Sequence, residues 1–228
     1  MYLAKVTPAQ LPPAEENDTV NALRLSQGAE PNVLADIYND NVDITVWQRD
    51  LSPSLSKTVV EFIEADPTHS TSIVVSPNDA ASAIYDAVGH VSSDEFCQDT
   101  AVLVDMFCTL FGVKEAGVRL TMLDKAMCPK FHVDRIPCRL ITTYNGIGTE
   151  WLPSHLVDRS KLGHGSQGKA DHESGLYRHE ENIQQLSCGD VAILKGDLWQ
   201  GSEGNGLVHR SPGVNEQHRL MLTIDMVS

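Results

Sequence analysis

The strongest constraint on the fold of this chain is a change of hydrophobic pattern near residue 115 of its 228 residues. Before that point, apolar residues recur at the three- and four-residue spacing of amphipathic helices. After it they form short runs separated by Gly, Pro and Asn, which is typical of strands and turns in an antiparallel sheet. Either half alone would leave an apolar face exposed. We therefore expect a single α+β domain over 1–228, a barrel or two-sheet sandwich backed by N-terminal helices.

The predicted domain has four parts. The Pro-rich, acidic segment 1–30 is expected to be extended. Residues 32–115 form a helical support layer, and 116–228 form the β-rich core that carries the functional site. The core contains a polar insertion, 157–185, which is rich in Gly and His. Loops of that length in compact domains are usually lids, binding loops or disordered insertions.

Local signals place the individual elements. A hydroxyl residue followed by Pro is a good helix start, and it occurs at Ser52-Pro53 and again at Ser76-Pro77. Ser93-Asp94-Glu95 opens a third helix, which is expected to end near Gly112. The expected strands are Val118–Leu123, Cys138–Tyr144, Val191–Leu194, Leu207–His209 and Leu220–Val227.

Composition limits the partners and the compartment. The formal net charge is −14, so a broad face that binds nucleic acid is excluded by repulsion from the phosphates. The five cysteines are irregularly spaced and include no CxxC, which argues against a disulfide framework and against a four-Cys zinc site. The N-terminus lacks the apolar run of a signal peptide, and no stretch is long enough to span a membrane. We expect a cytoplasmic protein with free thiols.

Three residues suggest a metal site. His132 and Asp134 alternate, so on a strand both side chains would point to the same face. His209 lies at the end of another apolar run, beside a turn, and would supply the third ligand. Two imidazoles and one carboxylate form the facial arrangement that binds Fe(II) and leaves coordination positions open for an oxidant and a co-substrate.

An anion-binding residue is also expected. Arg219 opens the last apolar strand, and a buried guanidinium needs an anionic partner. That partner is either an internal Asp or Glu or a small carboxylate ligand held in the bidentate geometry that Arg favours. Arg210 and Arg139 are alternative anion binders, because both lie close to the metal-site motifs.

The order of these motifs resembles that of the Fe(II)/2-oxoglutarate-dependent oxygenases over about 118–227. The resemblance rests on His132 with Asp134, Gly146 with Thr149, Gly189-Asp190, His209 and Arg219. It implies a double-stranded β-helix, a jelly-roll or cupin-like barrel. It assigns His132, Asp134 and His209 to Fe(II). It assigns Arg219 to the distal carboxylate of 2-oxoglutarate, with Tyr144 or Thr149 assisting.

The whole chain also resembles a bacterial family of unknown function. This second resemblance rests on Trp47-Gln48-Arg49, Phe131-His132-Val133-Asp134, Gly148-Thr149-Glu150-Trp151-Leu152 and Val208-His209-Arg210-Ser211-Pro212. Members are often encoded beside zinc-responsive GTPases of the CobW type. The resemblance therefore implies a link to such a GTPase and to metal handling, without establishing an activity.

Three functions follow from the sequence. The first is an Fe(II)/2-oxoglutarate-dependent dioxygenase whose substrate, a small molecule or a protein, the sequence does not specify. The second is a non-catalytic Zn(II)-binding protein that works with a metallochaperone GTPase; Cys128 or Cys138 would then join the same ligands in a closed tetrahedral site. The third is a cupin-like barrel that binds a small anion without redox chemistry.

Overall fold

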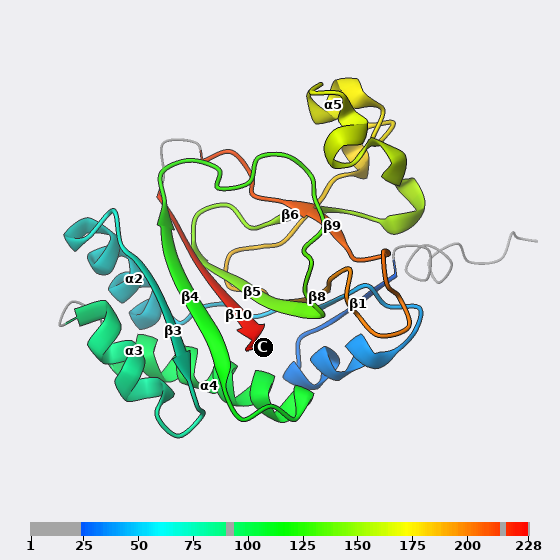
Figure 1. Ribbon diagram of the computed structural model, residues 1–228. Helices are drawn as coiled ribbons and strands as arrows, with labels where there is room; N and C mark the ends of the chain where they lie inside the picture. The colour runs from blue at the N-terminus through cyan, green and yellow to red at the C-terminus, as the bar shows by residue number, and fades with distance from the viewer. Residues whose placement is uncertain (1–23, 90–93, 215–217, 228) are drawn as a thin grey trace, which may run out of the picture.

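The computed structural model describes residues 24–89, 94–214 and 218–227, and its strands form two sheets (Figure 1). Neighbours in the larger sheet are antiparallel except for the β1–β2 pair, which is parallel. In spatial order the larger sheet contains β1 (Leu25–Gly28), β2 (Ile44–Trp47), β8 (Val191–Lys195), β5 (Cys138–Asn145), β10 (Arg219–Met226), β4 (Ala116–Leu123) and β3 (Ser70–Val75). The smaller sheet contains β7 (Gln184–Gln185), β6 (Glu150–Leu152) and β9 (Val208–Arg210).

Helices α2 (Pro53–Ala65), α3 (Ala80–Val88) and α4 (Asp94–Phe111) cover one face of the larger sheet (Figure 1). The predicted start of α2 is confirmed: the Ser52 hydroxyl accepts a 3.0 Å hydrogen bond from the backbone N–H of Leu55. The expected end of α4 is also confirmed, since the helix stops one residue before Gly112.

Helix α3 begins later than the Ser76-Pro77 signal indicates. The Ser76 hydroxyl donates a 2.8 Å hydrogen bond to the Asp79 carboxylate, and the N–H of Asp79 donates to the Ser76 carbonyl at 3.1 Å. These two bonds close a turn over residues 76–79, so the helix itself starts at Ala80. A short 3₁₀ helix, η1 (Pro31–Tyr38), precedes β2.

Alternation along the central strands gives the larger sheet two different faces. One face packs on the helices, where Leu140, Leu222 and Ile224 are fully buried with the helical side chains. The opposite face packs against the smaller sheet, with Ile141 and Met221 in that second cluster. Side chains two residues apart on β5 or β10 share a face. This inner face is the one that carries the candidate site.

The five strands expected after residue 115 all form, within two residues of their predicted bounds. The expectation of helices alone over 32–115 is wrong, because β2 and β3 lie in that segment, and β1 begins within the segment expected to be extended. The two strands that were not predicted, β2 and β3, are short and rich in β-branched residues, and they pair with β8 and β4. The mixed α+β class is confirmed. Closure into a double-stranded β-helix and the single-domain organisation stay predictions.

The polar insertion 157–185 is folded into short turns and projects beyond β6 and β9 (Figure 1). Its regular elements are η4 (Arg159–Lys161), η5 (Gly163–Ser166), α5 (Asp171–Ser174), η6 (Glu180–Asn182) and the short strand β7 at its end, and η3 (Ser154–Leu156) precedes it. Leu176 and Tyr177 of the insertion are buried against Phe131, Leu152 and Val208 of the core. The insertion is therefore packed onto the body of the protein beside the candidate site.

All five cysteines are free thiols, as predicted. In the part of the chain that the structure describes, no helix combines the length and the apolar character needed to cross a membrane. The cytoplasmic location stays a prediction.

Candidate metal centre

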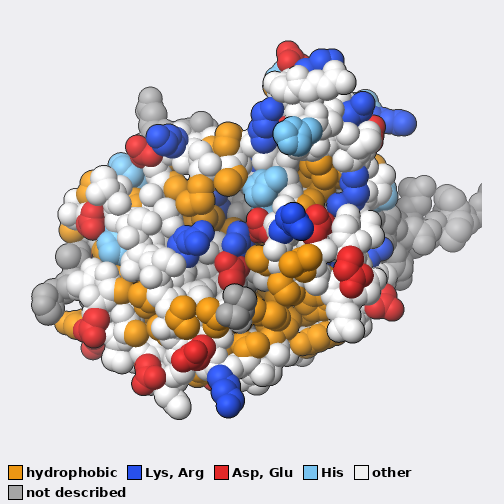
Figure 2. Space-filling model, in the orientation of Figure 1, with side chains coloured by type: hydrophobic (Ala, Val, Ile, Leu, Met, Phe, Trp, Pro, Cys, Tyr) orange, Lys and Arg blue, Asp and Glu red, His pale blue; other side chains and the backbone are white. Residues whose placement is uncertain are grey.

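The structure brings the three predicted metal ligands together. One potential ligand atom from each of His132, Asp134 and His209 lies within 4.8 Å of the others. The Nε2 atoms of His132 and His209 are 3.7 and 3.4 Å from the two Asp134 carboxylate oxygens. Figure 2 shows histidine, basic and acidic side chains gathered near the middle of this face, below the insertion. His132, Asp134 and His209 together form the candidate metal centre.

The two histidines are placed by a single β-bridge. His209 lies in β9, and His132 lies in the irregular segment before β5. Each backbone N–H donates to the other residue's carbonyl at 3.0 Å. Residues directly opposite each other in such a bridge project to the same side. The expectation that His132 and Asp134 alternate along a regular strand is therefore wrong. The segment that carries them forms no regular strand, and the isolated bridge with His209 orients His132 instead.

Backbone carbonyls orient both imidazoles. Nδ1 of His132 is 2.9 Å from the Lys130 carbonyl, and Nδ1 of His209 is 3.1 Å from the Leu207 carbonyl. With Nδ1 as the donor, the lone pair lies on Nε2, the atom that faces Asp134; metal-bound histidines are commonly held in this way. Burial, and then the neighbouring His209, lower the pKa of His132. The His132 ring is therefore neutral and able to bind a cation at neutral pH.

Asp134 is held as a carboxylate by its neighbours. Burial raises its pKa, but His209 and then Arg139 outweigh burial and hold the pKa at about 2. Arg139 donates from Nη1 to Asp134 at 2.7 Å, while its Nε and Nη2 bind Asp225 at 2.8 and 2.7 Å. This corrects the alternative in which Arg139 binds an anionic ligand, because two carboxylates already neutralise its guanidinium.

The cysteines do not complete a closed zinc site. Among the described residues, the cluster contains the two histidines and Asp134 without a sulfur atom. Cys138 packs on the helix-facing side of β5, where burial and then Asp225 raise its pKa to about 12. Cys128 is exposed at the mouth of the adjoining cavity. The structure therefore separates Cys138 from the predicted tetrahedral site and leaves Cys128 outside the ligand cluster. The donor set that it does bring together fits a facial triad with open positions.

Arg219 is buried without a carboxylate partner. Its side chain is 1% exposed. It donates hydrogen bonds to three hydroxyls, at 2.8 Å to Thr149, 3.0 Å to Thr143 and 3.1 Å to Ser211. No carboxylate of the described residues lies within 4.0 Å of it. Burial lowers its pKa to about 10, so the group is still charged at neutral pH. A buried cation without an anion is costly, and an anionic ligand would offset that cost.

Arg219 and the metal cluster share one small cavity of about 50 Å³. His132 and His209 line one part of the cavity, and Arg219 and Thr149 line another. Arg219 and Thr149, which the resemblance assigns to the same carboxylate of the co-substrate, are therefore in direct contact beside the candidate metal centre.

Two other predicted site residues contact protein groups instead. Tyr144 follows Thr143 on β5, so it points to the helix-facing side, where its buried hydroxyl donates to Asp99 at 2.6 Å. The assignment of Tyr144 to the co-substrate is corrected for that reason. Arg210 lines the cavity, but it binds Glu150 at 2.6 Å and Asp171 at 3.3 Å. Its charge is thus neutralised, and the alternative in which it binds a ligand anion is also corrected.

The sequence analysis missed two of the three hydroxyls that Arg219 contacts, those of Thr143 and Ser211, and the Asp225 carboxylate that binds Arg139. Strand alternation could have indicated Thr143, because it shares a face of β5 with Arg139. Ser211 lies two residues after His209, and the same rule applies. Asp225 lies opposite Arg139 because of the register between β10 and β5. The residue pattern of one strand does not predict its register with another strand.

Fold and site together define an α+β protein with a candidate centre of two histidines and one carboxylate. The chain belongs to the family described as protein of unknown function DUF1826, whose model matches residues 28–225. No curated protein matches the chain.

Several solved structures are similar in fold at low identity. A dioxygenase for auxin oxidation from rice has 11% identity and a TM-score of 0.48, with 82% of this chain and 74% of that chain covered. The corresponding protein of Arabidopsis thaliana, in complex with 2-oxoglutarate, has 12% identity, a TM-score of 0.47 and coverages of 90% and 92%. A prolyl-4-hydroxylase from Pseudomonas putida has 8% identity, a TM-score of 0.49 and coverages of 88% and 100%. At these scores, function must be judged from the side chains of the site.

Proposed function

We propose that this protein is an Fe(II)/2-oxoglutarate-dependent oxygenase. The observation that carries the proposal is the position of Arg219, a buried guanidinium without a carboxylate partner, in the same cavity as His132 and His209. A ligand that bridges the two must chelate a metal at one end and carry a negative charge at the other. 2-Oxoglutarate has this chemistry: its 2-oxo acid group can chelate iron, and its second carboxylate can pair with an arginine.

All three residues of the candidate centre would coordinate the metal. His132 and His209 would donate through Nε2, and the Asp134 carboxylate would supply the negative charge. A facial triad of this kind suits Fe(II), because it leaves neighbouring positions for a co-substrate and oxygen. When bound, Fe(II) and 2-oxoglutarate would supply the oxidising chemistry, in which decarboxylation of the 2-oxo acid is coupled to transfer of an oxygen atom to a substrate.

Arg219 and its hydroxyl neighbours would orient the co-substrate. The guanidinium is fixed by Thr143, Thr149 and Ser211, so little conformational freedom remains to be lost when a carboxylate binds. The cavity of about 50 Å³ is narrow for a five-carbon acid. Met127 and Cys128 are exposed at its rim. We expect both side chains to move outward on binding.

An anaerobic titration tests the chemistry directly. Metal-free protein receives Fe(II) and then 2-oxoglutarate, and the visible absorption is recorded. We expect a weak charge-transfer band that requires both additions and is absent from Asp134→Ala. Absence of the band from wild-type protein that binds Fe(II) would overturn the proposal.

A pair of arginine variants tests the anchor. Loss of a charge-assisted hydrogen bond costs about 1.5–3 kcal/mol, so Arg219→Gln should weaken 2-oxoglutarate binding roughly 10- to 100-fold while metal affinity is retained. Arg210→Gln is the matched control, because Arg210 is already paired with two carboxylates and should leave 2-oxoglutarate affinity nearly unchanged. The reverse pattern would move the anion site to Arg210.

A further inference from the structure

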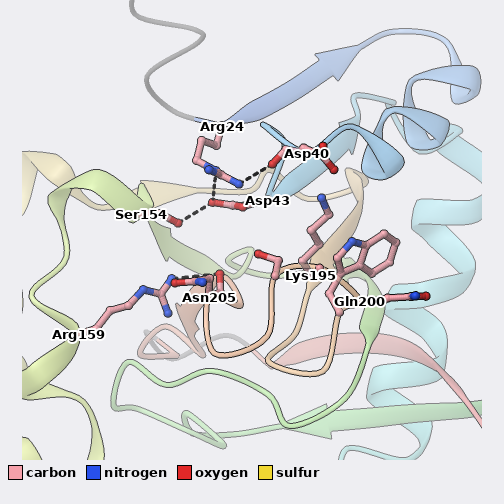
Figure 3. A pocket seen from close by; sticks show the side chains of 11 residues that line it. Arg24, Asp40, Asp43, Ser154, Arg159, Lys195, Gln200 and Asn205 are labelled. Carbon is pink, nitrogen blue, oxygen red and sulfur yellow. Dashed lines mark hydrogen bonds and ion pairs between the residues drawn. The ribbon is translucent and has the colours of Figure 1, made fainter.

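A second cavity lies on another part of the molecule, and it contains none of the candidate metal ligands (Figure 3). Its volume is about 420 Å³, within the range of small-molecule sites. Its walls come from the residue before β1, the segment before β2, the start of η3, the insertion, the end of β8 and the loop that follows β8. The lining residues with charged or aromatic side chains are Arg24, Asp40, Asp43, Arg159, Lys195 and Trp199.

Lys195 is an unusually buried cation at this cavity. Its side chain belongs to the last residue of β8, and the residue is only 3% exposed. Nζ donates to the Asn39 carbonyl at 2.9 Å and lies 5.0 Å from the centre of the Trp199 ring. An ammonium group has three donors. One carbonyl and one ring face leave it incompletely satisfied, and its burial lowers its pKa.

Arg159 lines the same cavity from the insertion (Figure 3). Its Nη2 donates to the carbonyls of Asn205 and Gly206 at 3.2 and 2.8 Å. No carboxylate of the described residues lies within 4.0 Å of its guanidinium, and its Nε and Nη1 make no hydrogen bond to a described residue. Burial lowers the pKa of this group as well. The cavity thus has two cations with free donors.

Among the described residues, no acidic side chain forms an ion pair with either of these two cations. Asp43 is 2% exposed, and its Oδ2 binds Nε of Arg24 at 2.9 Å and the Ser154 hydroxyl at 2.6 Å. Arg24 and Asp43 therefore compensate each other. Asp40 is exposed, and its backbone carbonyl, rather than its carboxylate, binds Arg24. Asp43 and Asp40 act on Lys195, and Asp197 and Asp43 act on Arg159, only through space, without an ion pair within 4.0 Å. The lining carries three cations and two carboxylates, so the cavity favours a negatively charged ligand.

We propose that this cavity binds a small anion through a carboxylate or phosphoryl group held by Lys195 and Arg159. Both cations can donate to an oxyanion, and Arg159 has the donors for bidentate contact. The Trp199 ring, beside Lys195, would pack against the non-ionic part of the ligand. The inference is independent of the proposed oxygenase function, because no candidate metal ligand and no contact of Arg219 takes part.

Binding can be followed at Trp199 in the full chain. The indole N–H resonance is assigned with Trp199→Phe, and inorganic phosphate and malonate are titrated separately against metal-free protein. A saturable shift with phosphate alone indicates a phosphoryl site, a shift with malonate alone indicates a carboxylate site, and a shift with both indicates a site that binds either oxyanion. Arg219→Gln must retain the shift, which separates this cavity from the one beside the metal centre.

Variants of the two cations decide the proposal. Arg159→Gln should weaken probe binding by about tenfold or more, as expected for loss of a charge-assisted contact. Lys161→Gln, on the same 3₁₀ helix but outside the cavity lining, is the matched control and should bind like wild type. Lys195→Met should abolish the shift. Because Lys195→Met changes a buried residue and can fail to fold, the test relies on Arg159→Gln, which changes a half-buried residue. Equal binding by Arg159→Gln and Lys161→Gln, or no saturable shift with either probe, would overturn the inference.

Discussion

Arg139 donates a 2.7 Å hydrogen bond from Nη1 to Oδ2 of Asp134, and so holds the candidate metal-binding carboxylate from behind. The remaining nitrogens of Arg139 bind both oxygens of Asp225, its direct partner in the register of β5 and β10. The orientation of Asp134 is thus transmitted from the central sheet. The irregular segment that carries Asp134 would not fix its carboxylate alone.

Removal of this support should weaken metal binding. In Arg139→Gln the carboxylate loses its oriented donor and can rotate, and loss of such outer contacts typically reduces metal affinity by about 10- to 100-fold. The measurement is a competition titration of Fe(II) or Zn(II) against a chelator. Arg119→Gln, an exposed arginine on β4, is the charge-matched control and should retain wild-type affinity. Unchanged affinity in Arg139→Gln would show that Asp134 needs no such support.

Within the usual pH range, the pH dependence of metal binding should come from His132. Asp134, with a pKa of about 2, is a carboxylate throughout the usual range. The pKa of His132 lies below its ordinary value of 6.5, so the ring is already neutral at pH 7. Protons compete with the metal only at those ligands that take up a proton within the pH range studied. Affinity should therefore be flat between pH 8 and 7 and should fall below the ordinary imidazole range. A steep loss of affinity as the pH falls from 8 to 7, measured by the same competition titration, would contradict this assignment.

The sequence predicted the parts of the site that depend on local pattern. Strand periodicity located β5, β9 and β10, and with them Arg139, His209 and Arg219, to within two residues. The rule that a buried arginine needs an anion identified Arg219 as a candidate binder, and the structure leaves it with hydroxyl partners alone. These predictions succeeded because period and burial are properties of a single strand.

The remaining errors arise from pairing between distant segments. The resemblance assigns Tyr144 to the co-substrate, but its neighbour Thr143 is the residue on the inner face of the sheet. The apolar pattern of β5 alone does not determine which of its two faces points inward. Arg139 and Arg210 were open as anion binders because Asp225 and Asp171 are 86 and 39 residues away in the chain. Such partners become visible only when the sheets and the insertion are in place.

The insertion should depend on Asp171 for its attachment beside the metal centre. The Asp171 carboxylate accepts a 2.9 Å hydrogen bond from the N–H of Phe131, next to His132, and pairs with Arg210 at 3.3 Å. In Asp171→Ala a buried N–H loses its acceptor, at a cost of about 1–3 kcal/mol. We expect faster proteolysis within 157–185 and weaker metal binding. Glu173→Ala, an exposed change on the same short helix, should match wild type in both assays. Identical digestion of the two variants would exclude this attachment.

Acid unfolding provides a test of the charge at Asp134 that needs no metal. Its pKa is lowered from 3.8 to about 2 in the folded protein, so the folded state binds this proton less tightly than the unfolded chain. The resulting stabilisation is fully present above pH 3.8 and is lost as the pH falls through the folded pKa. By linkage it amounts to roughly 2 kcal/mol.

Metal-free Asp134→Asn should therefore have a lower free energy of unfolding than wild type at pH 6, and the difference should shrink as the pH falls from about 4 toward 2. Urea titrations at a series of pH values measure it. The exposed Asp124→Asn removes the same charge without these contacts, and its curve should run parallel to that of wild type. If the gap between wild type and Asp134→Asn keeps a constant size down to pH 2.5, the loss would be one of packing, and the contacts of the Asp134 carboxylate with His209 and Arg139 would contribute nothing to folding.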